Sequence, residues 1–246
     1  MQAIDIFSPP VVLGTGGRKG AVLIDFGYYN LDCMEGMKQF EDKYFDLAIV
    51  DPPYGGVTEG GYMRNQMGGG KAINRNYHLA LWAQEKPTQD YFRELQRVSK
   101  NQIIWGGNYY ASMLSDSQCW IVWDKQKSPG MSFADVELAW TSFNLASRIF
   151  RFKWNGMLQG NMKHKEYKIH PTQKPVALYE WILQRYANPG DIILDTHVGS
   201  ASSLIACHRM HHKFVGFEID PVYYEMSKKR LDAEMAQMSI FDFIKE

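Results

Sequence analysis

A short apolar run that ends in two prolines constrains the fold of this chain more than any other feature. Leu47–Val50 is continuously apolar, which predicts a strand buried on both faces of a sheet. The tetrapeptide Asp-Pro-Pro-Tyr at 51–54 follows it, and two glycines come next. Each proline fixes its own φ and has no N–H to donate, so the sheet ladder has to stop there. The strand therefore ends in a carboxylate, a free carbonyl at Pro52 and an aromatic ring, an array that suits a planar group carrying an NH2.

Strand-like and helix-like patterns alternate along the rest of the sequence. This alternation predicts an α/β, doubly wound and mostly parallel sheet covered on both faces. With 246 residues, the chain fits one sizeable domain rather than two. The expected strands are 21–24, 46–50, 102–105, 119–123, 136–140, 191–195 and 213–219, and the expected helices are 34–40, 88–100, 174–187, 200–209 and 220–237.

Cysteine usage and hydropathy point to a reducing compartment. The three cysteines, at 33, 119 and 207, are odd in number and far apart, which argues against a disulfide framework. No apolar run approaches the length of a membrane span, and the first residues lack a basic start followed by an apolar stretch. We expect a cytoplasmic protein without a membrane partner. The Cys and His residues at 207–212 have no carboxylate partner in view, so no metal site is expected.

Charge is balanced over the whole chain but concentrated locally. There are 27 basic and 27 acidic residues, which taken alone argues mildly against nucleic acid. Residues 148–174, however, hold seven Lys or Arg and one acid, Glu166, with four aromatic residues among them. A solvated surface loop and a nucleic-acid contact explain such a stretch about equally well.

The segment 191–220 has the pattern strand, turn, helix, strand. Its first strand ends in Asp195, Gly199 and Ser200 allow a turn close to a ligand, and Glu218 ends the second strand. Glu218 stands where dinucleotide folds place the acid that binds ribose hydroxyls. A phosphate loop would need more glycines, so a ligand without phosphates, such as S-adenosylmethionine, fits better. A plain β–α turn with a surface Glu is the alternative.

A second polar cluster, His-Pro-Thr-Gln-Lys-Pro at 170–175, opens an expected helix. The free N–H groups of a helix start, with Thr172 and Lys174, make a site for a carboxylate. S-adenosylmethionine carries one. Simple helix capping explains this hexapeptide equally well when it is taken alone.

Taken together, these motifs resemble the DNA amino-methyltransferases, in the permuted class that has the catalytic motif ahead of the cofactor motif. The order is 51–54, 170–175, 195–202 and then Glu218, and the resemblance covers nearly the whole chain. It includes Asn-Leu-Asp-Cys at 30–33, Trp-Gly-Gly-Asn-Tyr at 105–109 and Trp-Ile-Val-Trp-Asp-Lys at 120–125, the last two typical of compact bacterial and bacteriophage members. Ala201 departs from the pattern, since the family usually has Gly there.

The resemblance implies a seven-stranded, Rossmann-like methyltransferase sheet with one antiparallel strand and a circularly permuted motif order. It implies one S-adenosylmethionine-dependent domain over 1–246, with target-recognition insertions at about 55–80 and 148–170. In it, Asp32 and Cys33 flank the adenine of the cofactor, Glu218 binds the ribose, and Thr172 and Lys174 hold the methionine part with the 195–200 turn. The implied cofactor residues are Asp32, Cys33, Asp51, His170, Thr172, Lys174, Asp195, Thr196, His197, Gly199, Ser200, Glu218 and Ile219.

The implied reaction is methyl transfer to the N6 amine of an adenine flipped out of double-stranded DNA. Asp51 and the Pro52 carbonyl would accept the amine hydrogens, Pro53 stiffens the turn, and Tyr54 stacks on the base. Asp rather than Ser at position 51 favours adenine N6 over cytosine N4. The expected DNA contacts are Arg64, Arg75, Arg148, Arg151, Lys153, Lys163 and Lys165.

Three other readings stay open at this point: an N4-cytosine enzyme, an RNA or protein amide methyltransferase, and a catalytically silent nucleic-acid-binding module. Relatives often dimerise, and many are paired with a restriction endonuclease. The sequence decides neither a homodimer nor a cognate endonuclease for this chain. If the reaction is as implied, the protein works in the cytoplasm at the nucleoid.

Overall fold

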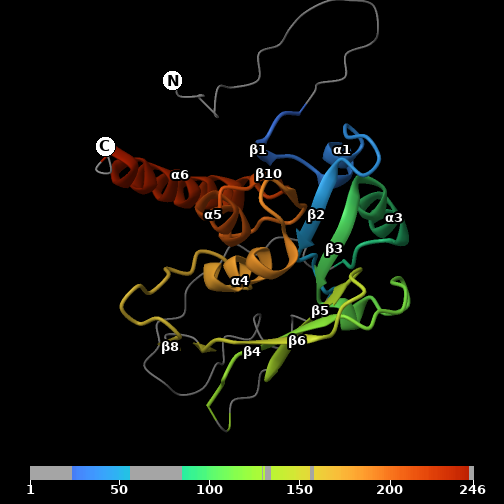
Figure 1. Ribbon diagram of the computed structural model, residues 1–246, viewed down its shortest axis with the longest axis horizontal. Coiled ribbons are helices and arrows are strands. Elements are labelled where there is room, and N and C mark those ends of the chain that lie inside the picture. The colour runs from blue at the N-terminus through green and yellow to red at the C-terminus, as the bar shows by residue number, and fades with distance from the viewer. Residues whose placement is uncertain (1–23, 56–84, 129, 131–133, 156–157, 244–246) are drawn as a thin grey trace, which may run out of the picture.

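The computed structural model describes residues 24–55, 85–128, 130, 134–155 and 158–243 (Figure 1). Eight strands form one sheet in the order β1-β10-β9-β2-β3-β5-β4-β6. A separate two-stranded sheet pairs β7 (Trp154–Asn155) with β8 (Leu158–Gln159). The bounds in the large sheet are β1 Gly27–Asn30, β2 Phe45–Val50, β3 Ser99–Trp105, β4 Trp120–Asp124, β5 Val136–Thr141, β6 Arg148–Arg151, β9 Ile192–Asp195 and β10 Lys213–Glu218.

The sheet confirms the predicted mixed α/β class with one reversed strand. Only β5 runs against its neighbours, because it pairs antiparallel with both β3 and β4, while every other described pair in this sheet is parallel. The predicted strand count of seven is wrong, since β6 adds an eighth strand at the edge. This strand was not expected because it pairs on one side only and exposes three of its four residues. Phe150 alone packs inward, against Phe152 and Trp181.

Five helices in the described residues cover the sheet: α1 (Cys33–Met37), α3 (Gln89–Val98), α4 (Val176–Tyr186), α5 (Ser202–Arg209) and α6 (Pro221–Phe243). All five match expected helices within a few residues, and α6 extends beyond the expected 237. The strand expected at 21–24 is not seen as such: residues 21–23 lie outside the described part, and the first described strand is β1. None of the described helices is long and apolar enough to span a bilayer.

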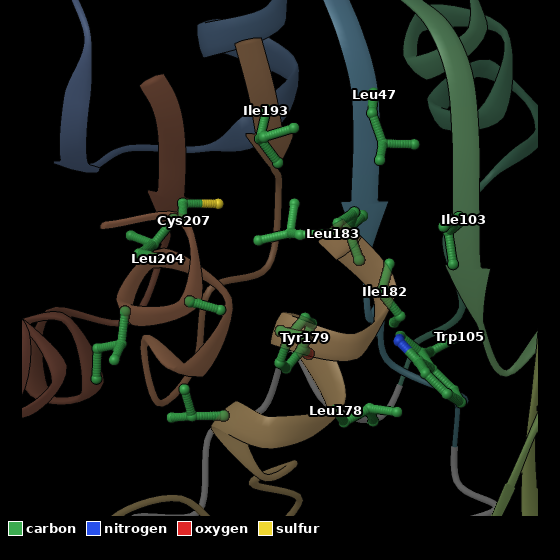
Figure 2. Packing of buried hydrophobic residues seen from close by; sticks show 14 of the residues in the cluster. Leu47, Ile103, Trp105, Leu178, Tyr179, Ile182, Leu183, Ile193, Leu204 and Cys207 are labelled. Atoms are coloured by element: carbon green, nitrogen blue, oxygen red, sulfur yellow. The ribbon is translucent and has the colours of Figure 1, made fainter. Parts of the chain in front are cut away.

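The sheet is buried on both faces, as the continuous apolar run in β2 predicts. Leu47 and Ile49 face one core, whereas Ala48 and Val50 face the other. The first core lies under α4 and α5, and the second lies under α1 and α3. Figure 2 shows the first core, in which side chains of α4 such as Ile182 lie against the sheet.

The pairing of β2 with β9 sets the position of the site. The two strands are parallel, with Leu47 beside Ile193 and Ala48 beside Leu194. From β9 the chain continues to β10 on one side, and from β2 it continues to β3 on the other side. In open α/β sheets, ligands bind beyond the carboxyl ends of the strands at such a switch point. The residues that follow β2 and β9 therefore share one edge of the sheet, although more than 140 positions separate them in sequence.

The turn between β9 and α5 packs closely on β10 and carries backbone strain. A Cβ on Gly216 would lie 2.8 Å from Val198 and 2.9 Å from Leu204, so only glycine allows this approach. Two residues of the turn are left-handed, Gly199 (φ 56°) and Ala201 (φ 61°). Glycine adopts this conformation freely, but in alanine the Cβ crowds the following carbonyl oxygen. Ala201, which directly precedes α5, is thus the strained member of the turn.

We predict that Ala201→Gly stabilises the protein by about 1 kcal/mol because it removes this crowding. Urea unfolding followed by circular dichroism measures the change. Ala206→Gly, in the right-handed interior of the same helix, is the matched control and should destabilise by about 1 kcal/mol. If Ala201→Gly loses as much stability as Ala206→Gly, whose side chain is equally buried, the left-handed conformation of Ala201 costs nothing.

Candidate active site

The carboxylate of Asp51 stands at the carboxyl end of β2 and is held on both of its oxygens. The Tyr54 hydroxyl donates to Oδ1 at 2.7 Å, and the Lys174 ammonium donates to Oδ2. Burial raises the pKa of Asp51, and the positive charge of Lys174 offsets part of that rise. A carboxylate offers about four lone-pair positions, so these two donors leave room for another.

The two proline carbonyls are fixed from the next strand connection. The Tyr110 hydroxyl lies 2.8 Å from the carbonyl oxygens of both Pro52 and Pro53 and can donate to either. The Pro52 carbonyl is therefore not free, in contrast to the expectation from sequence. It is outside the sheet ladder, as expected, but Tyr110 orients it. A carbonyl oxygen has two lone pairs, so the Pro52 oxygen keeps an accepting position.

The ring of Tyr54 is enclosed by the β3 connection. It stacks on Tyr109, with centroids 4.8 Å apart and an angle of 23° between the planes. Gly106 (φ 71°) lies against it so closely that a Cβ there would be 2.2 Å from the ring. Tyr109 ends the short 3-10 turn η2 (Gly107–Tyr109), which follows β3. Tyr109 covers one face of the Tyr54 ring. A planar ligand that stacks on that face would have to displace Tyr109.

A row of four charged side chains passes through the site. Lys174 is buried and makes ion pairs with Asp51 and, at 3.1 Å, with Glu137. Glu137 also pairs with Lys125, so positive and negative groups alternate along the row. Burial opposes the ionised form of Glu137, but Lys174 and Lys125 outweigh it and hold its pKa at about 2. Burial likewise opposes the charge on Lys174, yet Asp51 and Glu137 raise its pKa.

Sequence reasoning did not identify Glu137. The available signal was an acid inside the apolar strand pattern Val-Glu-Leu-Ala-Trp at 136–140. Lys174 was assigned to a carboxylate ligand, and the structure places its ammonium on two carboxylates of the chain itself. Any further carboxylate has to share this ammonium with Asp51 and Glu137.

Asp195 ends β9 beside the end of β2. Its carboxylate accepts the His197 N–H at 2.9 Å and the Ser203 hydroxyl at 2.5 Å. Burial raises its pKa to about 7, although both of these hydrogen bonds oppose the rise. The Thr196 hydroxyl lies between the Tyr91 hydroxyl (2.6 Å) and Nδ1 of His197 (2.9 Å). The beginning of the turn is thus fixed by α3 and α5 together.

Glu218 closes the turn from β10. Its two carboxylate oxygens accept the N–H groups of Gly199 at 2.8 Å and of Asp220 at 2.9 Å. Burial raises the pKa of Glu218, and these backbone bonds offset part of the rise. Ser200 is buried in the same turn, and Ile219, the next residue after Glu218, is half exposed.

Asp32 and Cys33 follow β1, the neighbour of β10. Asp32 caps α1 by accepting the N–H groups of Met34 and Glu35 at 2.8 and 3.2 Å. Burial raises the pKa of Cys33 to about 12, so its thiol stays protonated. Since Asn30 of β1 pairs with Glu218, these residues lie at the same sheet edge as Glu218.

The segment 170–174 bridges the two halves of the site. The His170 ring lies 3.7 Å from the position that a Cβ on Gly199 would take, and Lys174 reaches Asp51. The Thr172 hydroxyl lies 3.0 Å from Nδ1 of His170. Burial lowers the pKa of His170 to about 4, so the imidazole is neutral near pH 7. One short segment therefore contacts both the turn after β9 and the motif after β2.

Five of the seven predicted nucleic-acid contacts lie in the described part of the chain. Arg148 and Arg151 are exposed on the edge strand β6, Lys163 and Lys165 are exposed beyond β8, and Lys153 is half-buried. Arg64, Arg75 and nearly all of the 55–80 insertion lie outside the described residues.

Comparison with known proteins identifies the family. Residues 83–229, more than half of the chain, match the sequence profile of a family described as DNA methylase. This family comprises N6 and N4 methyltransferases. The Type II methyltransferase M.HpaI of Haemophilus parainfluenzae is 28% identical over 82% of this chain and 73% of its own length. The Type II methyltransferase M2.DpnII of Streptococcus pneumoniae is 27% identical over 92% and 81%.

Solved structures show the same fold. The M1.HpyAVI–SAM complex matches with a TM-score of 0.51 and 23% identity, covering 82% of this chain and 98% of its own. The PvuII DNA methyltransferase, described as cytosine-N4-specific, matches with a TM-score of 0.54 and 14% identity, covering 85% and 91%. The profile begins after the motif at 51–54, but both sequence relatives align over most of this chain. The chain therefore belongs to the DNA methylase family of N6-adenine and N4-cytosine methyltransferases.

Proposed function

We propose that this enzyme transfers the methyl group of S-adenosylmethionine to the N6 amine of an adenine flipped out of DNA. One observation carries the proposal. The Asp51 carboxylate and the Pro52 carbonyl are adjacent acceptors at the end of β2, next to the turn that begins at Asp195 on the neighbouring strand. Two neighbouring acceptors suit an NH2 group, and the turn suits the methyl donor.

The acceptors address the poor nucleophilicity of the amine, whose lone pair is delocalised into the base. When Asp51 and Pro52 accept its two hydrogens, the nitrogen becomes more tetrahedral and its lone pair turns towards the donor. Tyr54 stacks on the base and keeps it in the crevice. The high pKa that burial gives Asp51 makes it a better proton acceptor than an exposed carboxylate. The nitrogen gains the methyl carbon and loses one proton, for which Asp51 is the nearest base.

S-adenosylmethionine, when bound, supplies an electrophilic methyl group on a sulfur that leaves neutral. The buried carboxyl groups of the turn fit such a cation-bearing ligand. Asp195 and Glu218 have no basic side chain as partner among the described residues, and a positive charge beside them would favour their ionised forms. We assign the ribose to Glu218, the adenine to the side of Asp32, Cys33 and Ile219, and the methionine part to the 195–200 turn with Thr172. The rate enhancement then comes from positioning of the reactants and from electrostatic stabilisation of the transition state.

Adenine is preferred over cytosine because Asp rather than Ser begins the motif at position 51, which resembles the adenine-type members. The cytosine-N4 specificity of the structurally similar PvuII enzyme keeps N4 of cytosine as the second candidate.

We expect purified protein, incubated with methyl-labelled cofactor and DNA, to give labelled N6-methyladenine after digestion to nucleosides. Chromatography against N6-methyladenine and N4-methylcytosine standards separates the two bases. Label in N4-methylcytosine alone would end the adenine assignment. RNA and a glutamine peptide as acceptors test the remaining classes, and absence of transfer to every acceptor would favour a binding module.

Asp51→Ala should reduce methyl transfer by at least about 100-fold, because the amine loses a charged acceptor. Cofactor affinity, measured by calorimetry, should stay within about 3-fold, and the fold should persist because Lys174 keeps Glu137 as a partner. Asp42→Ala removes an exposed carboxylate and is the matched control. An active Asp51→Ala enzyme would contradict the mechanism.

The proposed target-recognition parts are the insertions at 55–80 and 148–170 of a single domain. We predict that Lys163→Ala with Lys165→Ala weakens DNA binding and reduces the slope of log K against log salt by about 1.8, since each phosphate contact contributes roughly 0.9. Fluorescence anisotropy from 50 to 300 mM KCl, about the range in which such contacts weaken, measures the slope.

The matched control for this pair is Lys38→Ala with Arg93→Ala, which removes two exposed charges from α1's end and α3. Its slope should equal that of the wild type. An unchanged slope in the Lys163/Lys165 variant would make the basic stretch a solvated surface.

A further inference from the structure

Lys174 is placed between two carboxylates that belong to different parts of the sheet. Asp51 follows β2, Glu137 lies on the antiparallel strand β5, and the Lys174 side chain between them is only 2% exposed. A buried ammonium is costly unless it is paired, and here either carboxylate alone would pair it. Lys174 can therefore weaken its contact with one of them without becoming an unpaired charge.

The two contacts of Lys174 differ in quality. Its ammonium makes a hydrogen bond to Oδ2 of Asp51, whereas Oε2 of Glu137 lies 3.1 Å away without an aligned hydrogen bond from any described residue. That buried oxygen is an acceptor towards which the ammonium can turn. Lys125 occupies the other oxygen of Glu137 and fixes the carboxylate. Glu137 is thus a second, prepared partner for Lys174.

We propose that Glu137 is a positioning residue that acts on Asp51 through Lys174. When the target amine reaches Asp51, the Lys174 ammonium moves its hydrogen bond from Asp51 to Glu137. The inference deepens the proposed function and rests on it for its role in turnover. In the absence of the amine, the Lys174 ammonium donates a hydrogen bond to the Asp51 carboxylate. As the amine donates to Asp51, Lys174 turns to Glu137, so the charges in the buried site stay paired throughout. Without Glu137, the amine would have to compete with an ammonium that has no other carboxylate partner among the described residues, its further contact being the Tyr54 hydroxyl at 3.3 Å.

Several further groups face Asp51 and set the background for its titration. They are the hydroxyls of Tyr54 and Tyr110, the buried Tyr179 of α4 and the carboxyl of Asp195. A neighbouring negative charge disfavours ionisation, so Glu137 raises the pKa of Asp51 and Lys174 lowers it. Removing the charge of Glu137 should therefore lower the pKa of Asp51. A defect in packing alone predicts no such direction.

The test is Glu137→Gln, which keeps the shape and removes the charge. We expect kcat to fall by about 10- to 100-fold, because Lys174 now stays on Asp51, while KM for the cofactor changes little. The acid limb of the kcat profile should move to lower pH. Unchanged kcat, or an acid limb that moves to higher pH, would overturn the inference and leave the proposed function intact.

Two companion variants separate this role from simple neutralisation of Lys125. If Glu137 only balanced that charge, Lys125→Met in the Glu137→Gln background would restore activity and overturn the inference. If it acts through Lys174, the double variant should remain as slow as Glu137→Gln. Glu94→Gln breaks another partly buried ion pair, with Arg97, and should leave both kcat and the acid limb unchanged.

A measurement without turnover keeps the inference testable if the wild type transfers no methyl group. Carboxyl 13C NMR of aspartate-labelled protein, with the Asp51 signal assigned by Asp51→Asn, gives its titration midpoint directly. The midpoint should lie at lower pH in Glu137→Gln than in the wild type, and the double variant should keep this shift. An unchanged or higher midpoint would overturn the coupling, whatever the enzyme transfers.

Discussion

The parallel pairing of β2 with β9 is the contact on which the rest of the site depends. It brings the end of one apolar strand, with its Asp-Pro-Pro-Tyr turn, beside the end of another strand more than 140 residues later. Because both strands are buried on both faces, a shift of register by one residue would move every side chain of the strand from one packed core into the other. The distance between the carboxylates of Asp51 and Asp195 is therefore set by the core, and loops do not have to define it.

The site contains several ionisable side chains that are buried. Other protein groups, rather than water, stabilise them. Asp51, Lys174 and Glu137 neutralise one another in a row that ends on Lys125. Asp195 and Glu218 instead rely on backbone N–H groups and a serine hydroxyl. In the first arrangement the charges hold one another in place. In the second, burial raises the pKa of both carboxyls and the hydrogen bonds offset only part of the rise, which suits a positively charged ligand. In the proposed reaction, the first arrangement faces the acceptor base and the second faces the methyl donor.

Much of the fold followed from the sequence because local patterns decide it. The apolar run of β2 and the apolar stripe of α3 are strong periodic signals, and both elements appear within a residue or two of the expected bounds. The edge strand β6 was missed because half of its residues are arginines and only Phe150 packs inward. Glu137 was missed because an acid in a strand pattern reads as a solvent-facing position. Only the fold shows that two lysines, 12 and 37 residues away, reach it. The motif residues 51–54, 170–174 and 195–200 do meet at one edge, but the partner of Lys174 depends on tertiary packing that no local pattern encodes.

The bridge at 170–174 connects the two halves of the site. The His170 ring packs against Gly199 in the turn after β9. Four residues later, Lys174 forms an ion pair with Asp51 in the motif after β2. Pro171 lies within this segment and Pro175 directly follows it, and each proline restricts the backbone at its own position. In the proposed reaction these two halves hold the methyl donor and the acceptor base, so one stretch of five consecutive residues would touch both sites.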